Sequence, residues 1–115
     1  MPSVLLVEDH APMRATLRMW LADVAAPITE CDNGLEVGAC YAAQRPDWVL
    51  MDIELPGQDG ITTTRELLLA NPTAHVLIVT GYDDAEMRSA AAAAGACGYV
   101  LKENLLDLRR LLLQT

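Results

Sequence analysis

The sequence predicts an α/β fold in three layers, with five parallel strands between two layers of helices. Five short apolar runs alternate with five helix-like segments along the chain. The runs are apolar throughout instead of at every second residue, which is typical of parallel strands that are buried on both faces. The predicted strands are Val4–Val7, Ile28–Cys31, Trp48–Met51, residues 76–79 and Gly98–Leu101.

The first predicted helix follows the first strand directly. Asp9 or His10 is available as its N-cap, and Pro12 stands at a first-turn position, where a missing N–H loses no helical partner. Apolar residues then recur at helical spacing along the segment. They are Met13, Leu17, Leu21 and Val24.

Turn and capping residues bound the next three helices. The second helix follows Asn33-Gly34 and ends before Pro46, and the third covers about residues 61–70. Asp83-Asp84 can cap the fourth helix, because aspartate side chains accept hydrogen bonds from first-turn N–H groups. Gly95 closes that helix.

The fifth predicted helix, over residues 104–114, is rich in leucine. One buried stripe on a helix of this length needs fewer apolar residues. Two explanations stay open: part of the helix serves a partner, or the chain was cut before a linker and an output domain. An exposed apolar patch would support the first explanation. The leucines include Leu105, Leu108, Leu111, Leu112 and Leu113.

The strict alternation of strand and helix determines the expected topology. Connections between parallel strands are right-handed, and at this chain length we predict the flavodoxin-like (βα)5 sandwich with strand order 2-1-3-4-5. Strands one and three are neighbours in that order, and the order changes direction at their junction. Ligands of open α/β sheets bind outside the carboxyl ends of the strands at such a point.

Composition restricts the class of protein. A chain of 115 residues with 52% hydrophobic content forms one domain, here residues 1–115. Its net charge of −8 argues against direct nucleic-acid binding. We find neither a basic signal segment nor an apolar stretch of the roughly 20 residues that span a membrane, so we expect a cytoplasmic protein. Cys31, Cys40 and Cys97 favour neither a disulfide framework nor a zinc site.

Charged and polar residues follow four of the five predicted strands. Taken singly, each could be a helix cap or a surface charge. Their joint occurrence at strand ends indicates instead that they share one crevice. The residues are Glu8 and Asp9 after the first strand, Asp52 after the third, Thr80 after the fourth and Lys102 after the fifth.

Carboxylates at this edge suit a Mg²⁺ ion, which prefers oxygen ligands and keeps several waters. Asp9 and Asp52 are the first candidates as ligands, and Glu8 would act through water or by its charge. A carboxylate can also attack phosphorus when cations neutralise the phosphoryl oxygens. Mg²⁺ and Lys102 would supply that positive charge, and the Thr80 hydroxyl can donate a hydrogen bond to the phosphoryl group.

Four segments resemble the receiver domain of two-component response regulators, and the likeness covers essentially the whole chain. The acidic pair lies in Leu-Val-Glu-Asp-His at 6–10, and Leu-Met-Asp-Ile-Glu-Leu-Pro-Gly-Gln-Asp-Gly at 50–60 resembles the phosphoacceptor loop. Val-Thr-Gly at 79–81 is similar to the segment of the switch hydroxyl, and Gly-Tyr-Val-Leu-Lys at 98–102 to the lysine strand.

This resemblance implies a phosphorylation-dependent signalling switch of a two-component system. Such a domain catalyses its own phosphorylation and dephosphorylation and is not a turnover enzyme of metabolites. Asp52 would accept a phosphoryl group from the phosphohistidine of a histidine kinase. Asp9, Asp52 and the backbone carbonyl of Glu54 would bind Mg²⁺, with Glu8 beside them.

The resemblance also implies a conformational response and a set of partners. Thr80 would move toward the phosphoryl group and Tyr99 would swing inward, which reshapes the surface of the fourth helix, fifth strand and fifth helix. An ordinary half-buried strand aromatic is the alternative for Tyr99. The expected partners are a sensor histidine kinase or phosphotransfer protein and an output domain or effector. A DNA-binding domain in the parent chain and a homodimer are candidates for that output.

Two positions depart from the resemblance or add to it. Many receivers have a cis proline after the lysine, but Glu103 follows Lys102 here. A cis bond before a non-proline residue costs about 3 kcal/mol, so we expect a trans bond or a locally strained loop. The Glu54 side chain can extend over the phosphate site and change the rate of dephosphorylation, in a direction that the residues alone do not give.

Two other functions stay open. A receiver-like domain could be a phosphate-independent interaction module, although the intact acidic residues, Thr80 and Lys102 count against it. A Mg²⁺-dependent phosphohydrolase with Asp52 as nucleophile is less favoured. Its usual D-x-D loop is only loosely similar to Asp52-x-Glu54, and the chain has little room for a substrate cap.

Overall fold

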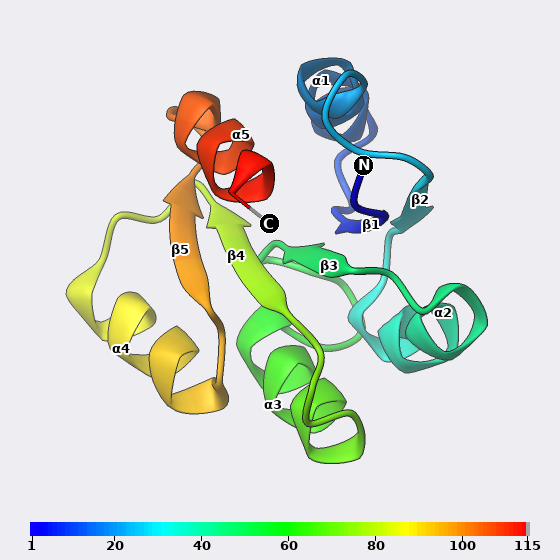
Figure 1. Cartoon of the computed structure of the whole chain (residues 1–115). Helices are drawn as coiled ribbons and strands as arrows, with labels where there is room; N and C mark the ends of the chain where they lie inside the picture. The colour runs from blue at the N-terminus through cyan, green and yellow to red at the C-terminus, as the bar shows by residue number, and fades with distance from the viewer. Residues whose placement is uncertain (115) are drawn as a thin grey trace.

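The computed structural model describes residues 1–114, and strands alternate with helices along them (Figure 1). The strands have the predicted ranges, except that the fourth includes Thr80. A short 3-10 helix at Gly34–Glu36 precedes the second α-helix. The elements are β1 Val4–Val7, α1 Ala11–Leu21, β2 Ile28–Cys31, α2 Val37–Gln44, β3 Trp48–Met51, α3 Gly60–Ala70, β4 Val76–Thr80, α4 Ala85–Ala94, β5 Gly98–Leu101 and α5 Leu105–Leu113.

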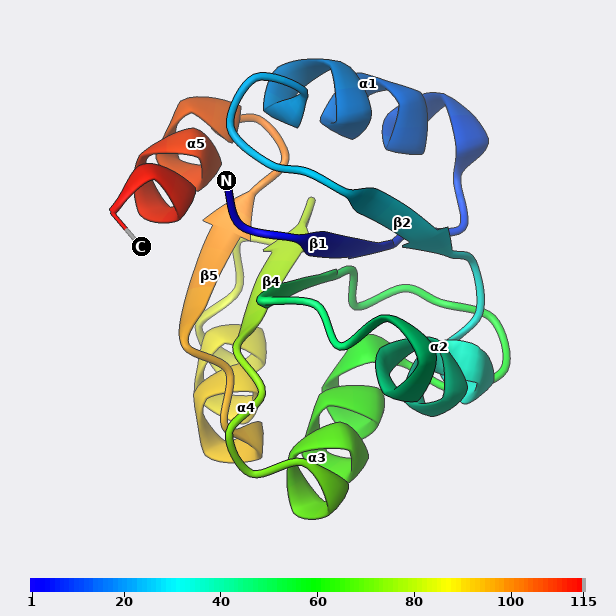
Figure 2. The same cartoon turned by 45° about the vertical axis from the view of Figure 1, so that its right-hand side comes forward.

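The five strands form one parallel sheet in the order β2-β1-β3-β4-β5, which confirms the predicted fold. Helices α1 and α5 cover one face of the sheet, and α2, α3 and α4 cover the other (Figure 2). β1 and β3 are direct neighbours, and Val7 at the end of β1 pairs with Met51 at the end of β3. Residues that follow these two strands therefore leave the sheet at the same place.

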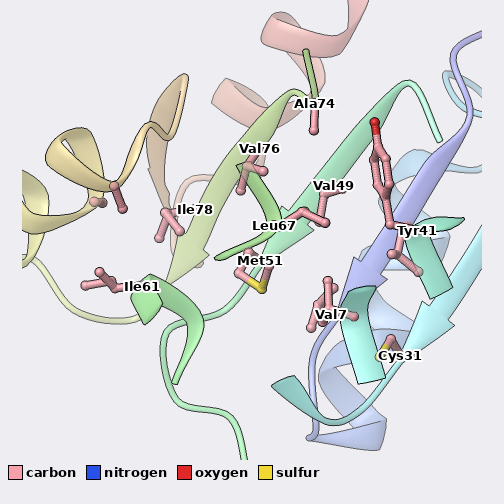
Figure 3. Close-up of a cluster of buried hydrophobic side chains, with 14 of the residues drawn as sticks. Val7, Cys31, Tyr41, Val49, Met51, Ile61, Leu67, Ala74, Val76 and Ile78 are labelled. Carbon is pink, nitrogen blue, oxygen red and sulfur yellow. The ribbon is translucent and has the colours of Figure 1, made fainter. Parts of the chain in front are cut away.

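Both faces of the sheet are buried, because alternate residues of a strand point to opposite faces. In β1, Leu5 and Val7 belong to the core under α2, α3 and α4, whereas Val4 and Leu6 belong to the core under α1 and α5. Figure 3 shows the first of these cores, in which Val7 and Met51 lie on the same side of the sheet. β1 and β4 are buried along their whole length, and the edge strands β2 and β5 are partly exposed.

Capping residues determine where several helices begin and end. Asp59 and Asp84 each accept hydrogen bonds from two backbone N–H groups in the first turns of α3 and α4. Gly95 ends α4 with a φ of 104°, in the left-handed region that favours glycine. His10 is the N-cap residue of α1, but its side chain makes no capping hydrogen bond.

Helix α5 has more apolar residues than its buried stripe requires, as the sequence indicates. Leu105, Leu108 and Leu112 are buried against the sheet, whereas Leu106 and Leu113 are 61% and 64% exposed. Within residues 1–114, no helix combines the length and the apolar character that a membrane span requires.

Gly60 allows the loop after β3 to fold back against the start of α3. A Cβ atom at this position would lie 1.8 Å from the backbone oxygen of Asp52. Gly38 in α2 is the opposite case, because a Cβ atom there would meet nothing within 4 Å. The chain therefore offers two helical glycines that differ in the space around them.

We predict that Gly60→Ala lowers the free energy of unfolding by about 3 kcal/mol or more, because backbone atoms must shift to relieve the overlap. Gly38→Ala should raise it by about 0.5–1 kcal/mol through the higher helix propensity of alanine. Urea unfolding of both variants and the wild type measures the two effects. Equal stabilities for the two variants would contradict the close approach at Gly60.

Candidate functional site

An acidic cluster lies where β1 and β3 end. The cluster consists of Glu8, Asp9 and Asp52, each with a carboxylate oxygen that lies within 4.8 Å of the others. Glu8 and Asp52 are only 2% and 5% exposed, whereas Asp9 is exposed. Within residues 1–114 the Asp9 side chain makes no hydrogen bond or ion pair, so its carboxylate is available to a ligand.

Lys102 reaches the acidic cluster from the end of β5. Its Nζ lies 2.5 Å from Glu8 Oε1 and 2.9 Å from Asp52 Oδ2. The sole cis peptide bond in residues 1–114 is Ala26–Pro27, so the bond between Lys102 and Glu103 is trans. The sequence predicted either a trans bond or a strained loop here. With the trans bond, the Lys102 ammonium still reaches the carboxylates of Glu8 and Asp52.

The electrostatics of the site follow from its burial. Burial raises the pKa of Glu8, the Asp52 carboxylate adds to the rise, and contact with Lys102 offsets only part of it. Burial alone would lower the pKa of Lys102, but its contacts with Glu8 and Asp52 outweigh that effect and raise the pKa. Lys102 thus stays charged and compensates part of the negative charge around it.

The cluster fits a divalent cation. The buried Oε1 atom of Glu8 has an ionic contact with Lys102 but no hydrogen bond of normal geometry. Three ionised carboxylates around one ammonium leave a net charge of about −2, which a hard cation with oxygen ligands would neutralise. The donor set consists of oxygen atoms alone, as Mg²⁺ prefers. The backbone carbonyl of Glu54 lies in the loop directly after Asp52.

A pocket of about 290 Å³ opens beside Asp52, at the carboxyl ends of the strands. Asp52 Oδ1 accepts a hydrogen bond of 2.7 Å from the backbone N–H of Ile53, and Lys102 contacts Oδ2. The pocket is large enough for a tetrahedral anion next to the Asp52 carboxylate. Its lining residues are Asp52, Glu54, Thr80, Gly81, Tyr82 and Lys102.

Tyr99 lies outside this pocket, on β5. Its ring packs against the core under α4, and its hydroxyl donates a hydrogen bond of 2.7 Å to the backbone carbonyl of Tyr82. The guanidinium of Arg88 lies 4.5 Å from the centre of the ring. Burial raises the pKa of the Tyr99 hydroxyl, and the Arg88 charge offsets part of the rise.

The structure brings together most of the residues that the sequence singled out. The acidic cluster, Lys102, Thr80 and Glu54 meet at one end of the sheet, and Tyr99 stands apart on the α4 side. Sequence reasoning did not find Tyr82 and Arg88. Their contacts with Tyr99 join different elements of the fold, and no spacing of residues along the chain predicts such contacts.

Comparison with known proteins identifies the class. The family model described as response regulator receiver domain matches residues 4–113. The chain therefore belongs to this family and is a receiver domain of two-component response regulators, a signalling domain. The predicted family is confirmed.

Individual relatives agree with this assignment. The chemotaxis protein CheY of Halobacterium salinarum is 38% identical over 99 residues, which are 86% of this chain and 82% of that protein. A DNA-binding response regulator of the LuxR family from Staphylococcus aureus has a similar structure, with a TM-score of 0.89 and 25% identity over 99% of this chain and 98% of that one. The BeF3-activated N-terminal receiver domain of Klebsiella pneumoniae RstA has a TM-score of 0.86 and 27% identity, over 98% of this chain and 99% of that one.

Other curated relatives are longer than this chain. The chain spans 22% of one of them and 49% of another. Activities that belong to the additional parts of such proteins are therefore not established for this chain by the match.

We predict that Glu8→Gln stabilises the domain at pH 8 when a chelator removes divalent cations. The ordinary pKa of Glu8 is 4.5 and the folded state raises it, so the unfolded state ionises first as the pH rises. The wild type therefore loses stability between pH 4.5 and the raised pKa, and the neutral amide does not. Urea unfolding across pH 4.5 to 8 measures the difference, and parallel pH profiles of the two proteins would contradict the prediction.

Proposed function

We propose that this domain is a phosphorylation-controlled switch in which Asp52 accepts the phosphoryl group. The observation that carries the proposal is the position of the Asp52 carboxylate, between the Lys102 ammonium and a pocket of about 290 Å³. Asp52 is the one member of the acidic cluster that lines this pocket. The membership of the chain in the receiver family supports the same assignment.

The chemistry is an in-line phosphoryl transfer from a phosphohistidine to a carboxylate. An oxygen of Asp52 forms a bond to phosphorus while the bond from phosphorus to the histidine nitrogen breaks, and the histidine takes up a proton. Lys102 donates to the phosphoryl oxygens and balances their charge, and the Thr80 hydroxyl donates a further hydrogen bond. Hydrolysis of the resulting aspartyl phosphate by water restores the free carboxylate.

Glu8, Asp9, Asp52 and the backbone carbonyl of Glu54 are the groups that would hold a Mg²⁺ ion. The bound ion would add positive charge to that of Lys102 and so help neutralise the phosphoryl oxygens. Asp9 is suited to this role because its carboxylate is exposed and has no partner within residues 1–114. Glu8 contributes mainly through its charge, since Lys102 already contacts it.

The proposal includes partners of two kinds. A sensor histidine kinase or a phosphotransfer protein would deliver the phosphoryl group. Because such donors obtain it from ATP, we propose a cytoplasmic location for the domain. An output domain or effector would read the surface of α4, β5 and α5. The similar structure from Staphylococcus aureus is described as a DNA-binding response regulator, which supports a DNA-binding domain in the parent chain. A homodimer through the same surface is a further candidate.

We predict that incubation with acetyl phosphate and Mg²⁺ adds one phosphoryl group to the wild type, measured by intact mass. Asp52→Asn should add none, because an amide nitrogen and carbonyl are poor nucleophiles. Asp32→Asn, a change of an exposed carboxylate outside the acidic cluster, is the matched control and should be modified normally. A chelator should abolish the adduct.

Two results would contradict the proposed function. No adduct and no binding of beryllofluoride would favour a phosphate-independent interaction module. Sustained turnover of small phosphate esters, lost in Asp52→Asn, would favour a phosphohydrolase.

We also predict that Mg²⁺ raises the unfolding free energy, by about 2.7 kcal/mol when its concentration is 100 times the dissociation constant. Thermal unfolding with and without Mg²⁺ measures this effect. Asp9→Asn should remove most of it, whereas Asp32→Asn should keep it. The same gain in both variants would place the cation elsewhere.

A further inference from the structure

The backbone of Tyr82 connects the candidate pocket with the aromatic side chain on β5. Its N–H donates to Thr80 Oγ1 over 3.4 Å, and its carbonyl accepts from the Tyr99 hydroxyl over 2.7 Å. Thr80 lines the pocket, and Tyr99 packs against the core on the α4 side. A single loop residue is therefore bonded to both residues that the sequence predicts as the switch.

Arg88 covers the ring of Tyr99. The carbon of its guanidinium lies 4.5 Å from the ring centroid, and Nη2 lies 3.2 Å from Asp83 Oδ1. Arg88 belongs to the first turn of α4, Asp83 to the preceding loop and Tyr99 to β5, which runs beside α4 (Figures 1 and 2). These contacts join three segments around one half-buried aromatic ring.

We propose that Arg88 is a positioning residue that holds Tyr99 in this orientation, with its hydroxyl bonded to the Tyr82 carbonyl, before phosphorylation and thereby raises the affinity of the Asp52 pocket for a phosphoryl group. The second half of this inference rests on the proposed function, because it takes Asp52 as the phosphoryl acceptor. The first half, the orientation of Tyr99, can be measured without any ligand.

The physical reason lies in the partial burial of Tyr99. Its hydroxyl bond to Tyr82 fixes one end of the side chain, but a half-buried ring can still turn out to solvent about its χ1 angle. A guanidinium stacked on the ring opposes that rotation through cation–π attraction. Asp83 fixes the orientation of the guanidinium, and the planar shape of the arginine head makes it better suited to stacking than a lysine ammonium.

The expected effect on ligand affinity follows from population arithmetic. When only one of two states binds a ligand well, the apparent affinity falls in proportion to the population of that state. Loss of one cation–π contact and one exposed ion pair changes the ratio of the two states about tenfold, which corresponds to about 1.4 kcal/mol. A tenfold change in that ratio lowers a population of about 90% to about 50%, so we expect Arg88→Ala to weaken binding of a phosphoryl analogue about 2-fold.

The experiment combines ¹⁹F NMR of protein labelled with 3-fluorotyrosine and calorimetric titration of unlabelled protein with beryllofluoride and Mg²⁺. Tyr99→Phe identifies the Tyr99 resonance among the three tyrosines. The test variants are Arg88→Ala, Arg88→Lys and Asp83→Asn. Arg110→Ala is the matched control, because Arg110 is also an exposed helical arginine paired with an aspartate, Asp107, and has no contact with an aromatic ring within residues 1–114.

The inference predicts that the ligand-free Tyr99 resonance of Arg88→Ala moves toward the position of an exposed tyrosine and that beryllofluoride binds about 2-fold more weakly. Arg88→Lys and Asp83→Asn should fall between Arg88→Ala and the wild type, and Arg110→Ala should match the wild type. An unchanged Tyr99 resonance in Arg88→Ala would overturn the inference. A shifted resonance with unchanged beryllofluoride affinity would overturn the link to the pocket.

Failure of the proposed function has a different signature. In that case the wild type and every Arg88 variant would bind no beryllofluoride, whereas the ¹⁹F spectra would still report whether Arg88 positions Tyr99.

Discussion

The rest of this molecule depends on one electrostatic constraint. Three carboxylates and one ammonium lie close together at the carboxyl end of the parallel sheet. Backbone hydrogen bonds hold two of the carboxylates in place, because Glu8 N–H donates to Cys31 and Asp52 N–H donates to Val7, each over 3.0 Å. These bonds continue the sheet by one residue beyond β1 and β3, so the backbone keeps the Cα atoms of Glu8 and Asp52 at the same end of the sheet. Lys102 compensates part of the charge, and the remaining negative charge suits this end of the sheet to a cation.

The packing around the acidic cluster holds its backbone rigidly. The buried strands supply the rigid support, since both faces of β1, β3 and β4 are covered by helices. The loop after β3 folds back so closely that Gly60 has no room for a side chain beside the Asp52 carbonyl. The turn keeps the Asp52 carboxylate at the edge of an open pocket although the residue is 5% exposed. The Asp52 carboxylate is thereby both buried and next to a pocket that a small anion can enter.

The sequence predicts more of the fold than of the side-chain contacts. Apolar runs and capping residues gave the strands and helices, and strict alternation gave the strand order, because these depend on local patterns. Strand order then placed the acidic pair beside Asp52. Strand order does not predict the pairing of Lys102 with Glu8. That contact depends on how far the flexible Lys102 side chain extends from β5 across the end of β4. The stacking of Arg88 on Tyr99 depends on the path of a loop and the orientation of a helix, which no periodicity encodes.

One short loop connects the candidate pocket with the α4 side of β5. Residues 81–84 join the end of β4 to α4, and Asp84 already caps that helix. Tyr82 is bonded to Thr80 on one side and to Tyr99 on the other. Under the proposed function, a displacement of the Thr80 hydroxyl toward a phosphoryl group would reach Tyr82, the Tyr99 hydroxyl and the start of α4, where Arg88 lies on the same ring. Such a switch would need no long path of coupled residues, because one loop residue contacts both Thr80 and Tyr99.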